Sequence, residues 1–318
     1  MMEDIILSIV IVTYNHEKYI RQTLDSVIMQ KMKFSYEIYI GDDASTDKTP
    51  LIVEEYAKKC DAITAICRTK NVGANYNAYD LLKRTKGKYI AFLDGDDYWT
   101  DKNKLQIQVD FMERHPQYIG CTHRFEIVDE NGNRKRKQKL SWVKFKKTFT
   151  LKDFDGITLP GQASTLVRKN LFAHSDIDMS IIYKTHSLIG DRTSALIYLC
   201  NGDFAGIDRK MSCYRQVEKM TGQNATSKQY MNNENKIIEE VDLLKRLEEI
   251  AFQLFQVKFS TSKRREELLC SALKEWIKRG DVSSLKYVLS KSENILIMFL
   301  KIPYIIFRKS LIKLKDIR

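Results

Sequence analysis

The chain has 318 residues, of which 43% are hydrophobic, 30% charged and 10% aromatic. This length suits one large α/β domain with an appendage or two modest domains, and this composition excludes a disordered, collagen-like or low-complexity chain. The 53 Lys and Arg outnumber the 41 Asp and Glu, which gives a net charge of +12 and favours a polyanionic partner such as nucleic acid, an anionic membrane surface or a phosphorylated substrate.

The cysteines and the first residues favour a cytoplasmic protein. The six cysteines form no C-x-x-C pair, and scattered cysteines in a chain of this size are typical of reduced thiols. The chain starts with the acidic pair Glu3-Asp4, where a signal peptide would be basic. The apolar run 5–12 is too short to span a bilayer, which needs ~20 residues. We therefore expect a cytoplasmic location.

The first part of the chain alternates strand-like and helix-like segments. The predicted strands, in chain order, are Leu7–Thr13, Tyr36–Ile40, 62–67 and 88–93. The predicted helices are 17–31, 49–59, 75–84 and 104–114. The second helix starts with Thr49 as N-cap and Pro50 as first helical residue. This order predicts a mainly parallel sheet with helices on both sides.

The rest of the chain is less regular. Further strands are predicted at 118–129, 161–167 and 204–207, with a helix at 186–200 and a hairpin turn at Asn131-Gly132. From about residue 229 onward the pattern indicates helix, with many i,i+4 charge pairs. The predicted fold class is α/β, a mainly parallel sheet flanked by helices with an α-helical C-terminal extension. The predicted domains are residues 1–220 and 221–318.

Acidic residues follow two of the predicted strands. Asp42 and Asp43 follow the second strand, and Asp94, Asp96 and Asp97 follow the fourth. In open α/β sheets, ligands bind at the carboxyl ends of the strands, and several carboxylates there repel one another unless a cation compensates. Mg²⁺ and Mn²⁺ prefer oxygen ligands and leave positions open for phosphate. Either cluster alone also fits a solvated turn, but two clusters at corresponding strand ends favour a metal site.

Familiar phosphate-binding motifs are missing. The first strand is not followed by G-x-G-x-x-G, and G-x-x-x-x-G-K-[ST] occurs nowhere. This argues against a dinucleotide oxidoreductase and a P-loop NTPase. The pair His16-Glu17 begins like a zinc-protease motif, but Ile20 stands where the second His would be. A site without a glycine cradle can still hold a diphosphate through a metal bridge.

Four segments, in this order, resemble glycosyltransferase family 2. They are SIVIVTYN at 8–15, GDDASTDKT at 41–49, NVG at 71–73 and FLDGDDYW at 92–99. The similarity covers about residues 6–215. The family consists of inverting enzymes of the GT-A fold, a Rossmann-like sheet with flanking helices, that use nucleotide-diphosphate sugars. The resemblance therefore implies this fold and such a donor.

The resemblance also implies which residues bind the donor. The Thr13-Tyr14 turn matches the part that packs against base and ribose. Asp43 matches the residue that accepts a hydrogen bond from uracil N3–H, which suits a carboxylate because it only accepts. The full set implied for the nucleotide-sugar is Thr13, Tyr14, Asn15, Asp43, Asn71, Gly73, Asp94 and Gly95.

The same comparison implies a metal site and a catalytic base. Asp94 and Asp96 match the D-x-D motif, with Asp96 as the preferred ligand of Mn²⁺ or Mg²⁺ and Asp97 as the next candidate. The metal would bridge the diphosphate and neutralise charge on the leaving group. Asp191, in Gly190-Asp191-Arg192, matches the acid that deprotonates the acceptor hydroxyl. The alternative is that Asp191 only caps a helix.

The chain departs from the family pattern near residue 215. Tyr214-Arg215 matches a family pair, but Val217 stands where many members carry a His associated with metal or diphosphate. Lys219, in the loop 216–228, is an alternative phosphate contact. The remaining histidines show no ligand spacing, so a structural or exposed role is expected for each.

Two basic segments each leave two interpretations open. Residues 134–147 hold eight Lys and Arg and no acid. They either approach the acidic head of a lipid-linked acceptor or form a solvated face. Residues 295–307 carry a single charge, Lys301. This segment either lies at an anionic membrane surface or packs back on the catalytic domain.

Together these observations predict an inverting, metal-dependent glycosyltransferase that moves a sugar, with UDP as the expected nucleotide, to an acceptor hydroxyl in surface polysaccharide assembly. The expected partners are the sugar donor, a saccharide acceptor for which a lipid link is one option, and the inner face of the cell membrane as a possible peripheral attachment site. The alternative is a non-catalytic nucleotide-sugar-binding module that recruits partners through its helical tail. A nucleic-acid partner is not expected, because no nucleic-acid-binding signature accompanies the basic charge.

Overall fold

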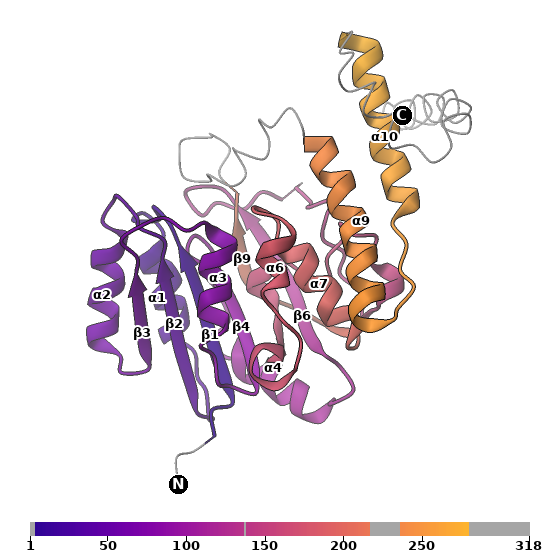
Figure 1. Cartoon of the computed structure of the whole chain (residues 1–318). Helices are drawn as coiled ribbons and strands as arrows, with labels where there is room; N and C mark the ends of the chain where they lie inside the picture. The colour runs from indigo at the N-terminus through magenta and orange to yellow at the C-terminus, as the bar shows by residue number, and fades with distance from the viewer. Residues whose placement is uncertain (1–3, 137, 217–235, 280–318) are drawn as a thin grey trace. The chain divides into compact units, whose positions relative to one another are not determined.

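The computed structural model describes residues 4–136, 138–216 and 236–279 (Figure 1). The chain divides into two compact units, Met1–Met231 and Asn232–Arg318. The domain boundary predicted between residues 220 and 221 lies outside the described residues and stays a prediction.

A parallel sheet forms the first part of the first unit. Its strands are β1 (Leu7–Thr13), β2 (Tyr36–Asp42), β3 (Ile63–Cys67) and β4 (Tyr89–Asp94), in the spatial order β3-β2-β1-β4. The central strand β1 is buried along almost its whole length, as its run of β-branched residues predicts.

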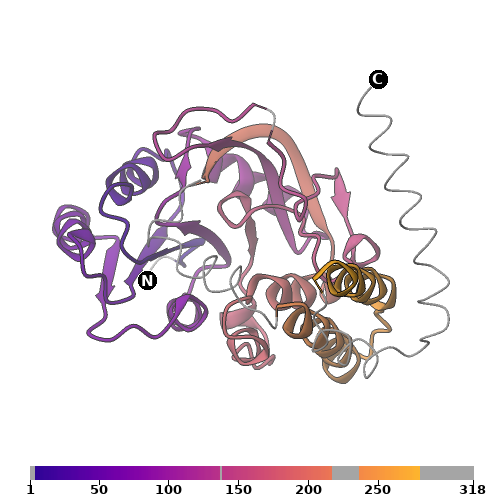
Figure 2. The ribbon, with the colours of Figure 1, turned by 90° about the horizontal axis from the view of Figure 1, so that it is seen from above.

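Helices cover both faces of this sheet (Figure 2). Leu7, Ile9 and Ile11 of β1 point to one face, where α1 (Ile20–Ile28), α2 (Thr49–Lys59) and α4 (Lys104–Arg114) complete a buried cluster. Val10 points to the other face and packs with α3 (Ala74–Leu82). Successive side chains of β1 point to opposite faces of the sheet, so this strand contributes to a buried cluster on each face. The predicted α/β sheet with helices on both sides is confirmed.

The sheet continues beyond β4 with strands of mixed direction. The order is β4-β8-β6-β9-β5, with β7 also paired to β9. The bounds are β5 (Tyr98–Trp99), β6 (Gly120–Val128), β7 (Thr148–Phe149), β8 (Val167–Lys169) and β9 (Phe204–Arg215). β8 runs antiparallel to both β4 and β6, while β6 and β9 are parallel.

Short helices connect these strands. They are η1 (Leu151–Asp153), η2 (Ala163–Thr165), α5 (Leu171–His174), α6 (Ile181–Thr185) and α7 (Asp191–Cys200). The strand predicted at 161–167 is wrong, because η2 occupies its middle and β8 begins only at Val167. The Gln162 side chain accepts a hydrogen bond from Ser164 N, and this local bond closes a 3₁₀ turn instead.

Of two local predictions, one is wrong and one is confirmed. Thr49 is not the N-cap of α2: its hydroxyl accepts a hydrogen bond from His16 N at 2.9 Å, and Asp47 accepts one from Thr49 N. The turn at Asn131-Gly132 does form, since Asp129 N donates to Asn133 O. In the described part of the basic segment after it, Arg134 forms an isolated bridge with Val128, Lys135 N donates to Ile127 O, and Lys147 O accepts from Gly206 N.

The second unit is helical where it is described. α9 (Lys236–Phe255) and α10 (Ser262–Arg279) pack against each other. Glu248 of α9 accepts hydrogen bonds from the Thr261 hydroxyl and from Arg265 of α10. The helical C-terminal region is confirmed, but the chain leaves the helix at 256–261, where Gln256 has a φ of 55°.

Among the described residues, no helix combines the length and the apolar character needed to cross a membrane. The membrane prediction for residues 295–307 and the contact proposed for Lys219 fall outside the described residues.

Candidate active site

The acidic turns predicted to converge follow neighbouring strands of the parallel sheet. In the β-sheet register, Thr13 of β1 faces Asp42 of β2, and Val12 faces Asp94 of β4. Because neighbouring strands lie about 4.8 Å apart, the backbones of Asp42 and Asp94 lie within about 10 Å of each other, with the end of β1 between them. The carboxyl edge predicted as the ligand site is therefore one continuous surface.

The turn after β4 lies close against the end of β1. Gly95 N donates to Val12 O at 2.8 Å, and Asp97 N donates to Asp94 O at 3.0 Å. A Cβ at Gly95 would lie 2.7 Å from Thr13 Cβ and 2.8 Å from His16 Nδ1. Glycine is needed here because only a missing side chain permits this approach.

Asp97 is buried and fully engaged within the protein. Its side chain accepts hydrogen bonds from Gln162 Nε2 and from Arg215 N, both at 2.8 Å. Burial, with the charges of Asp96 and Asp94, raises its pKa well above the ordinary value. The carboxylate thereby joins the turn after β4 to the loop before η2 and to the end of β9.

Arg215 reinforces the same turn from the other side. Its guanidinium donates to Asp96 O at 2.9 Å, to the carbonyl oxygens of Asp129 and Glu130, and to Gln22 Oε1 at 2.7 Å. It also stacks 4.5 Å from the ring centre of Tyr19. This planar group with several donors fixes the backbone that presents Asp94 and Asp96.

Asp94 senses the charges of Asp96 and Asp191. Asp94 is half-buried, and this burial, followed by the charges of Asp96 and Asp191, raises its pKa to about 7. Asp191 is the first residue of α7 and is exposed to solvent. The surrounding protein atoms raise its pKa, an effect that contact with water limits. The structure thus places the predicted base near the predicted metal ligands.

The start of α7 is also tied to the loop before α3. Asn75 Nδ2 donates to His186 O at 2.9 Å, and a Cβ at Gly190 would lie 2.9 Å from Asn75 Oδ1. His186 Nδ1 in turn accepts hydrogen bonds from Leu188 N and Ile189 N. These contacts fix the backbone just before Asp191.

Asp43 organises the loop at 71–73. Its two oxygens accept hydrogen bonds from Val72 N at 2.8 Å and Gly73 N at 2.9 Å, and Asn71 Nδ2 donates to Asp43 O at 3.0 Å. Gly73 has a φ of 87°, which favours glycine. Each carboxylate oxygen can accept a further hydrogen bond, so this arrangement is compatible with the predicted base contact.

The segment 13–15 continues this edge. Thr13 is buried and Tyr14 is half-buried. Asn15 has a φ of 55°, and its Oδ1 accepts a hydrogen bond from Thr46 N at 2.8 Å while its own N donates to Ser45 Oγ. Ser45 also donates to the buried carboxylate of Asp42. These hydrogen bonds therefore fix the turn after β1 to the turn after β2.

The family model of glycosyl transferase family 2 matches residues 8–175, just over half of the chain. The chain belongs to glycosyl transferase family 2. Among its relatives, Rv1520, an uncharacterized protein of Mycobacterium tuberculosis, is 42% identical over 138 residues, which are 43% of this chain and 40% of Rv1520. The putative teichuronic acid biosynthesis glycosyltransferase TuaG of Bacillus subtilis is 38% identical over 107 residues, 34% of this chain and 42% of TuaG. The matches thus span about two fifths of these relatives.

Solved structures share the fold of this family 2 chain. The crystal structure of Staphylococcus aureus TarS 1-349 in complex with UDP-GlcNAc superimposes with a TM-score of 0.52 at 20% identity, covering 84% of this chain and 80% of that one. At this identity the likeness concerns the fold, and it confirms the predicted GT-A architecture.

Two side chains of this family 2 site were missed in the sequence. His16 Nε2 lies 3.9 Å from Asp96 Oδ2, and its Nδ1 lies 3.2 Å from Thr13 Oγ1. Burial and the charges of Asp97, Asp96 and Asp94 raise the pKa of the Tyr214 hydroxyl. For His16, the spacing of three residues from Thr13 was the available signal. Tyr214 stands out in the sequence only as half of a Tyr-Arg pair.

No group of three or more His, Cys, Asp or Glu stands ready to hold a metal ion among the described residues of this family 2 chain. The donor set at Asp94 and Asp96 nevertheless suits a hard divalent cation, because it consists of carboxylate oxygens and leaves room for phosphate oxygens to complete the shell.

Proposed function

We propose that this chain is an inverting glycosyltransferase that transfers a sugar from a UDP-sugar to an acceptor hydroxyl in the assembly of a surface polysaccharide. The observation that carries the proposal is the convergence of the acidic turns at the edge where β1, β2 and β4 end, where Asp94 senses the charges of Asp96 and Asp191. We further propose residues 1–220 as the catalytic domain and 221–318 as a helical extension.

The donor nucleotide is assigned to the surface formed by segment 13–15, Asp43 and the loop 71–73. Asp43 is held in place by the amides of Val72 and Gly73, and each of its oxygens keeps a lone pair that can accept a hydrogen bond from the uracil imide. The relatives support UDP: TarS has been crystallised with UDP-GlcNAc and is a poly(ribitol-phosphate) β-N-acetylglucosaminyltransferase. TuaG, a putative teichuronic acid glycosyltransferase, supports a polysaccharide acceptor.

We assign Mn²⁺ or Mg²⁺ to Asp94 and Asp96. The repulsion that the half-buried Asp94 experiences from Asp96 and Asp191 is what a cation would relieve. When bound, the ion supplies positive charge to the departing diphosphate. Asp97, the third predicted ligand, ties Gln162 and the backbone of Arg215 to the turn after β4, so we assign it to holding the turn.

Asp191 is proposed as the general base. It is exposed, so an acceptor hydroxyl can reach it, and it is the first residue of α7. Its raised pKa makes it a stronger proton acceptor once it is ionised. Its carboxylate takes the acceptor proton as the hydroxyl oxygen attacks the anomeric carbon, and the nucleotide diphosphate leaves from the opposite face. Gly190 and Asn75 fix its position.

A thermal-shift series tests the donor site. Ligands that bind the folded state raise the melting temperature by mass action, and a concentration of 100 Kd adds about 2.7 kcal/mol. UDP-sugars with Mn²⁺ should raise it more than GDP-sugars, and EDTA should cancel the gain. Asp96→Ala should lose the Mn²⁺-dependent part, whereas the exposed control Asp176→Ala should keep it. A parent chain that responds to no nucleotide sugar would reject the proposed function.

The base is tested by UDP release from the UDP-sugar. Asp191→Asn should keep the donor-induced thermal shift and lose about 10²- to 10⁴-fold in turnover, the usual contribution of a general base. Asp176→Asn, at an exposed carboxylate between α5 and α6, should retain both. If Asp191→Asn releases UDP as fast as the parent, another residue is the base. A parent that binds the donor but never turns over would favour the non-catalytic binding module.

A further inference from the structure

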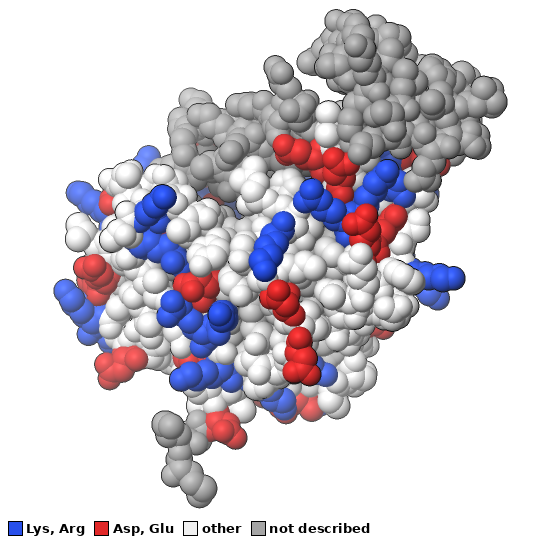
Figure 3. Space-filling model, in the orientation of Figure 1, with Lys and Arg blue, Asp and Glu red and all other residues white. Residues whose placement is uncertain are grey.

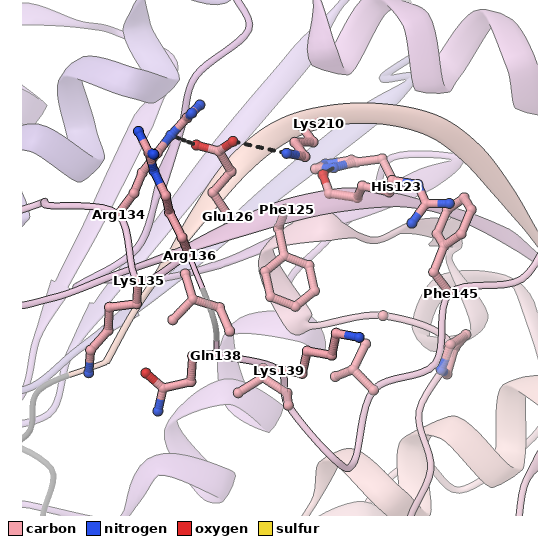
Figure 4. Close-up of a pocket in the computed structure, with 16 residues that line it drawn as sticks. His123, Phe125, Glu126, Arg134, Lys135, Arg136, Gln138, Lys139, Phe145 and Lys210 are labelled. Atoms are coloured by element: carbon pink, nitrogen blue, oxygen red, sulfur yellow. Dashed lines mark hydrogen bonds and ion pairs between the residues drawn. The ribbon is translucent and has the colours of Figure 1, made fainter. Parts of the chain in front are cut away.

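A basic cavity lies beside the candidate active site, between β6, β9 and the segment that follows the Asn131-Gly132 turn (Figure 4). Its volume is about 530 Å³. Its wall combines aromatic, aliphatic and charged side chains, which include Arg124, Arg134, Lys135, Arg136, Lys139 and Lys210. The only carboxylate among the lining residues is Glu126.

Internal ion pairs neutralise only part of this charge. Glu126 lies between Arg134 and Lys210 and pairs with both (Figure 4). Arg124 pairs with Asp208 at 2.5 Å and stacks 4.1 Å from the centre of the Phe145 ring. His123 adds no charge near neutral pH, because burial and nearby Lys104 hold its pKa well below the ordinary value.

Arg136 and Lys139 are the cations of the cavity that remain available. Both are exposed, and in the part of the chain that the structure describes neither has an ion pair or hydrogen bond through its side chain. On the face shown in Figure 3, by contrast, basic and acidic side chains are interspersed. The cavity therefore has an excess of positive charge that its own carboxylate does not balance.

Aromatic side chains connect the cavity to the carboxylates. Phe125 of the cavity wall meets the Tyr214 ring edge-on with centroids 6.4 Å apart, and Trp142 meets the same ring at 6.3 Å. Tyr214 in turn senses the charges of Asp94, Asp96 and Asp97. Gly161 of the wall also precedes Gln162, which bonds to Asp97. Tyr214 and Gln162 thus link the cavity wall to the acidic edge.

We propose that this cavity binds a phosphate group carried by the acceptor, so that the acceptor is a phosphate-bearing saccharide or polyol. The inference rests on the proposed function. The carboxylates of Asp94, Asp96 and Asp191 repel a phosphate of the acceptor. In the cavity, Arg136 and Lys139 offer that phosphate charge-assisted hydrogen bonds. The aromatic and aliphatic wall suits the carbon skeleton between phosphates.

The test is a calorimetric titration of the full chain with short linear inorganic polyphosphate in EDTA, which keeps metal out of the donor site. The variant Arg136→Ala/Lys139→Ala should weaken binding about tenfold or more, since it removes two charge-assisted contacts. The control Lys33→Ala/Lys58→Ala removes two exposed cations outside the cavity and should stay within about twofold of the parent. Both variants should keep the thermal shift with UDP-sugar and Mn²⁺.

Equal affinities for the parent and the cavity variant, or an equal loss in the control, overturn the proposal. Tighter binding of a short single-stranded RNA than of polyphosphate of the same charge overturns it in favour of a nucleic-acid site. Binding to phosphatidylglycerol vesicles, with phosphatidylcholine vesicles as the neutral reference, shows whether the phosphate belongs to a lipid or to a soluble polymer. Loss of vesicle binding in the cavity variant indicates a phospholipid-borne phosphate, and loss with polyphosphate alone indicates a soluble phosphate polymer. Because the titration omits the donor, it remains informative if the proposed function fails.

Discussion

Lys104 is a buried amine whose removal should stabilise the protein near neutral pH. It is the first residue of α4 and is 0% exposed. Its Nζ lies 4.2 Å from the centre of the Trp99 ring and has no hydrogen-bond partner within the described part of the chain. Burial lowers its pKa from 10.5 to about 7, because a charged ammonium is poorly solvated there.

This shift sets the size and sign of a pH effect. Between pH 7 and pH 10.5 the unfolded amine is protonated while the folded amine is largely neutral, so unfolding takes up a proton and stability rises with pH. The slope approaches about 1.4 kcal/mol per pH unit. From pH 7 to pH 9 the parent should therefore gain ~2 kcal/mol through Lys104.

The assay is urea unfolding of the parent and of Lys104→Met at pH 7, 8 and 9, followed by tryptophan fluorescence. The methionine fills a similar volume without a charge, so the variant should be more stable than the parent at pH 7 by several kcal/mol. This advantage should shrink by ~2 kcal/mol at pH 9. His123 stays neutral across this range, because its pKa lies well below the ordinary value, and does not contribute.

Lys102→Met is the matched control, because Lys102 is exposed two residues away. Its stability difference from the parent should not vary with pH. If the difference between Lys104→Met and the parent is also flat from pH 7 to pH 9, the amine keeps its ordinary pKa and the reasoning from burial fails.

Three further substitutions probe the site itself. Gly95→Ala should destabilise the protein by about 1–3 kcal/mol in urea unfolding, since its Cβ would lie 2.7 Å from Thr13. Asp97→Asn should lower the free energy of unfolding by about 1–3 kcal/mol at pH 7. Both oxygens of Asp97 accept from N–H donors, so the amide nitrogen of Asn would face another donor. Wild-type stability of this variant would refute the reasoning. Asp43→Asn loses one of the two amide contacts to the loop 71–73 and should weaken UDP binding about tenfold in calorimetry, and unchanged affinity would count against the proposed base contact.

The regular elements were predictable where one pattern dominates. The helix predicted at 104–114 is α4 to the residue, and β1 has the predicted bounds. β9 runs from 204 to 215, although only 204–207 was predicted. The exposed residues 208–210 interrupt its apolar pattern, and the neighbouring strand β6 shifts register at Arg124.

The interruption before α7 was also invisible in the sequence. A helix was predicted from residue 186, but the His186 ring accepts hydrogen bonds from Leu188 N and Ile189 N. This turn delays the helix to Asp191. A side chain that satisfies nearby amides competes with the helix, and apolar periodicity does not register that competition.

For the candidate site, the motifs located the acidic turns, but the sequence could not separate their roles. Asp96 and Asp97 are adjacent and of the same type, yet Asp97 is buried against Gln162 and Arg215. Those partners lie 65 and 118 residues away in the chain. Such long-range contacts depend on the order of β4, β8, β6 and β9, which local patterns do not determine.

The contact between Gly190 and Asn75 joins the segment before Asp191 to the segment after the loop 71–73. Asn75 follows the loop that Asp43 holds, and Gly190 precedes Asp191. With 2.9 Å between Asn75 Oδ1 and the place of a Cβ, a larger side chain at position 190 pushes both segments at once. In the proposed reaction, recognition of the leaving nucleotide and activation of the incoming hydroxyl would then change together, so variants at position 190 should alter both donor affinity and turnover.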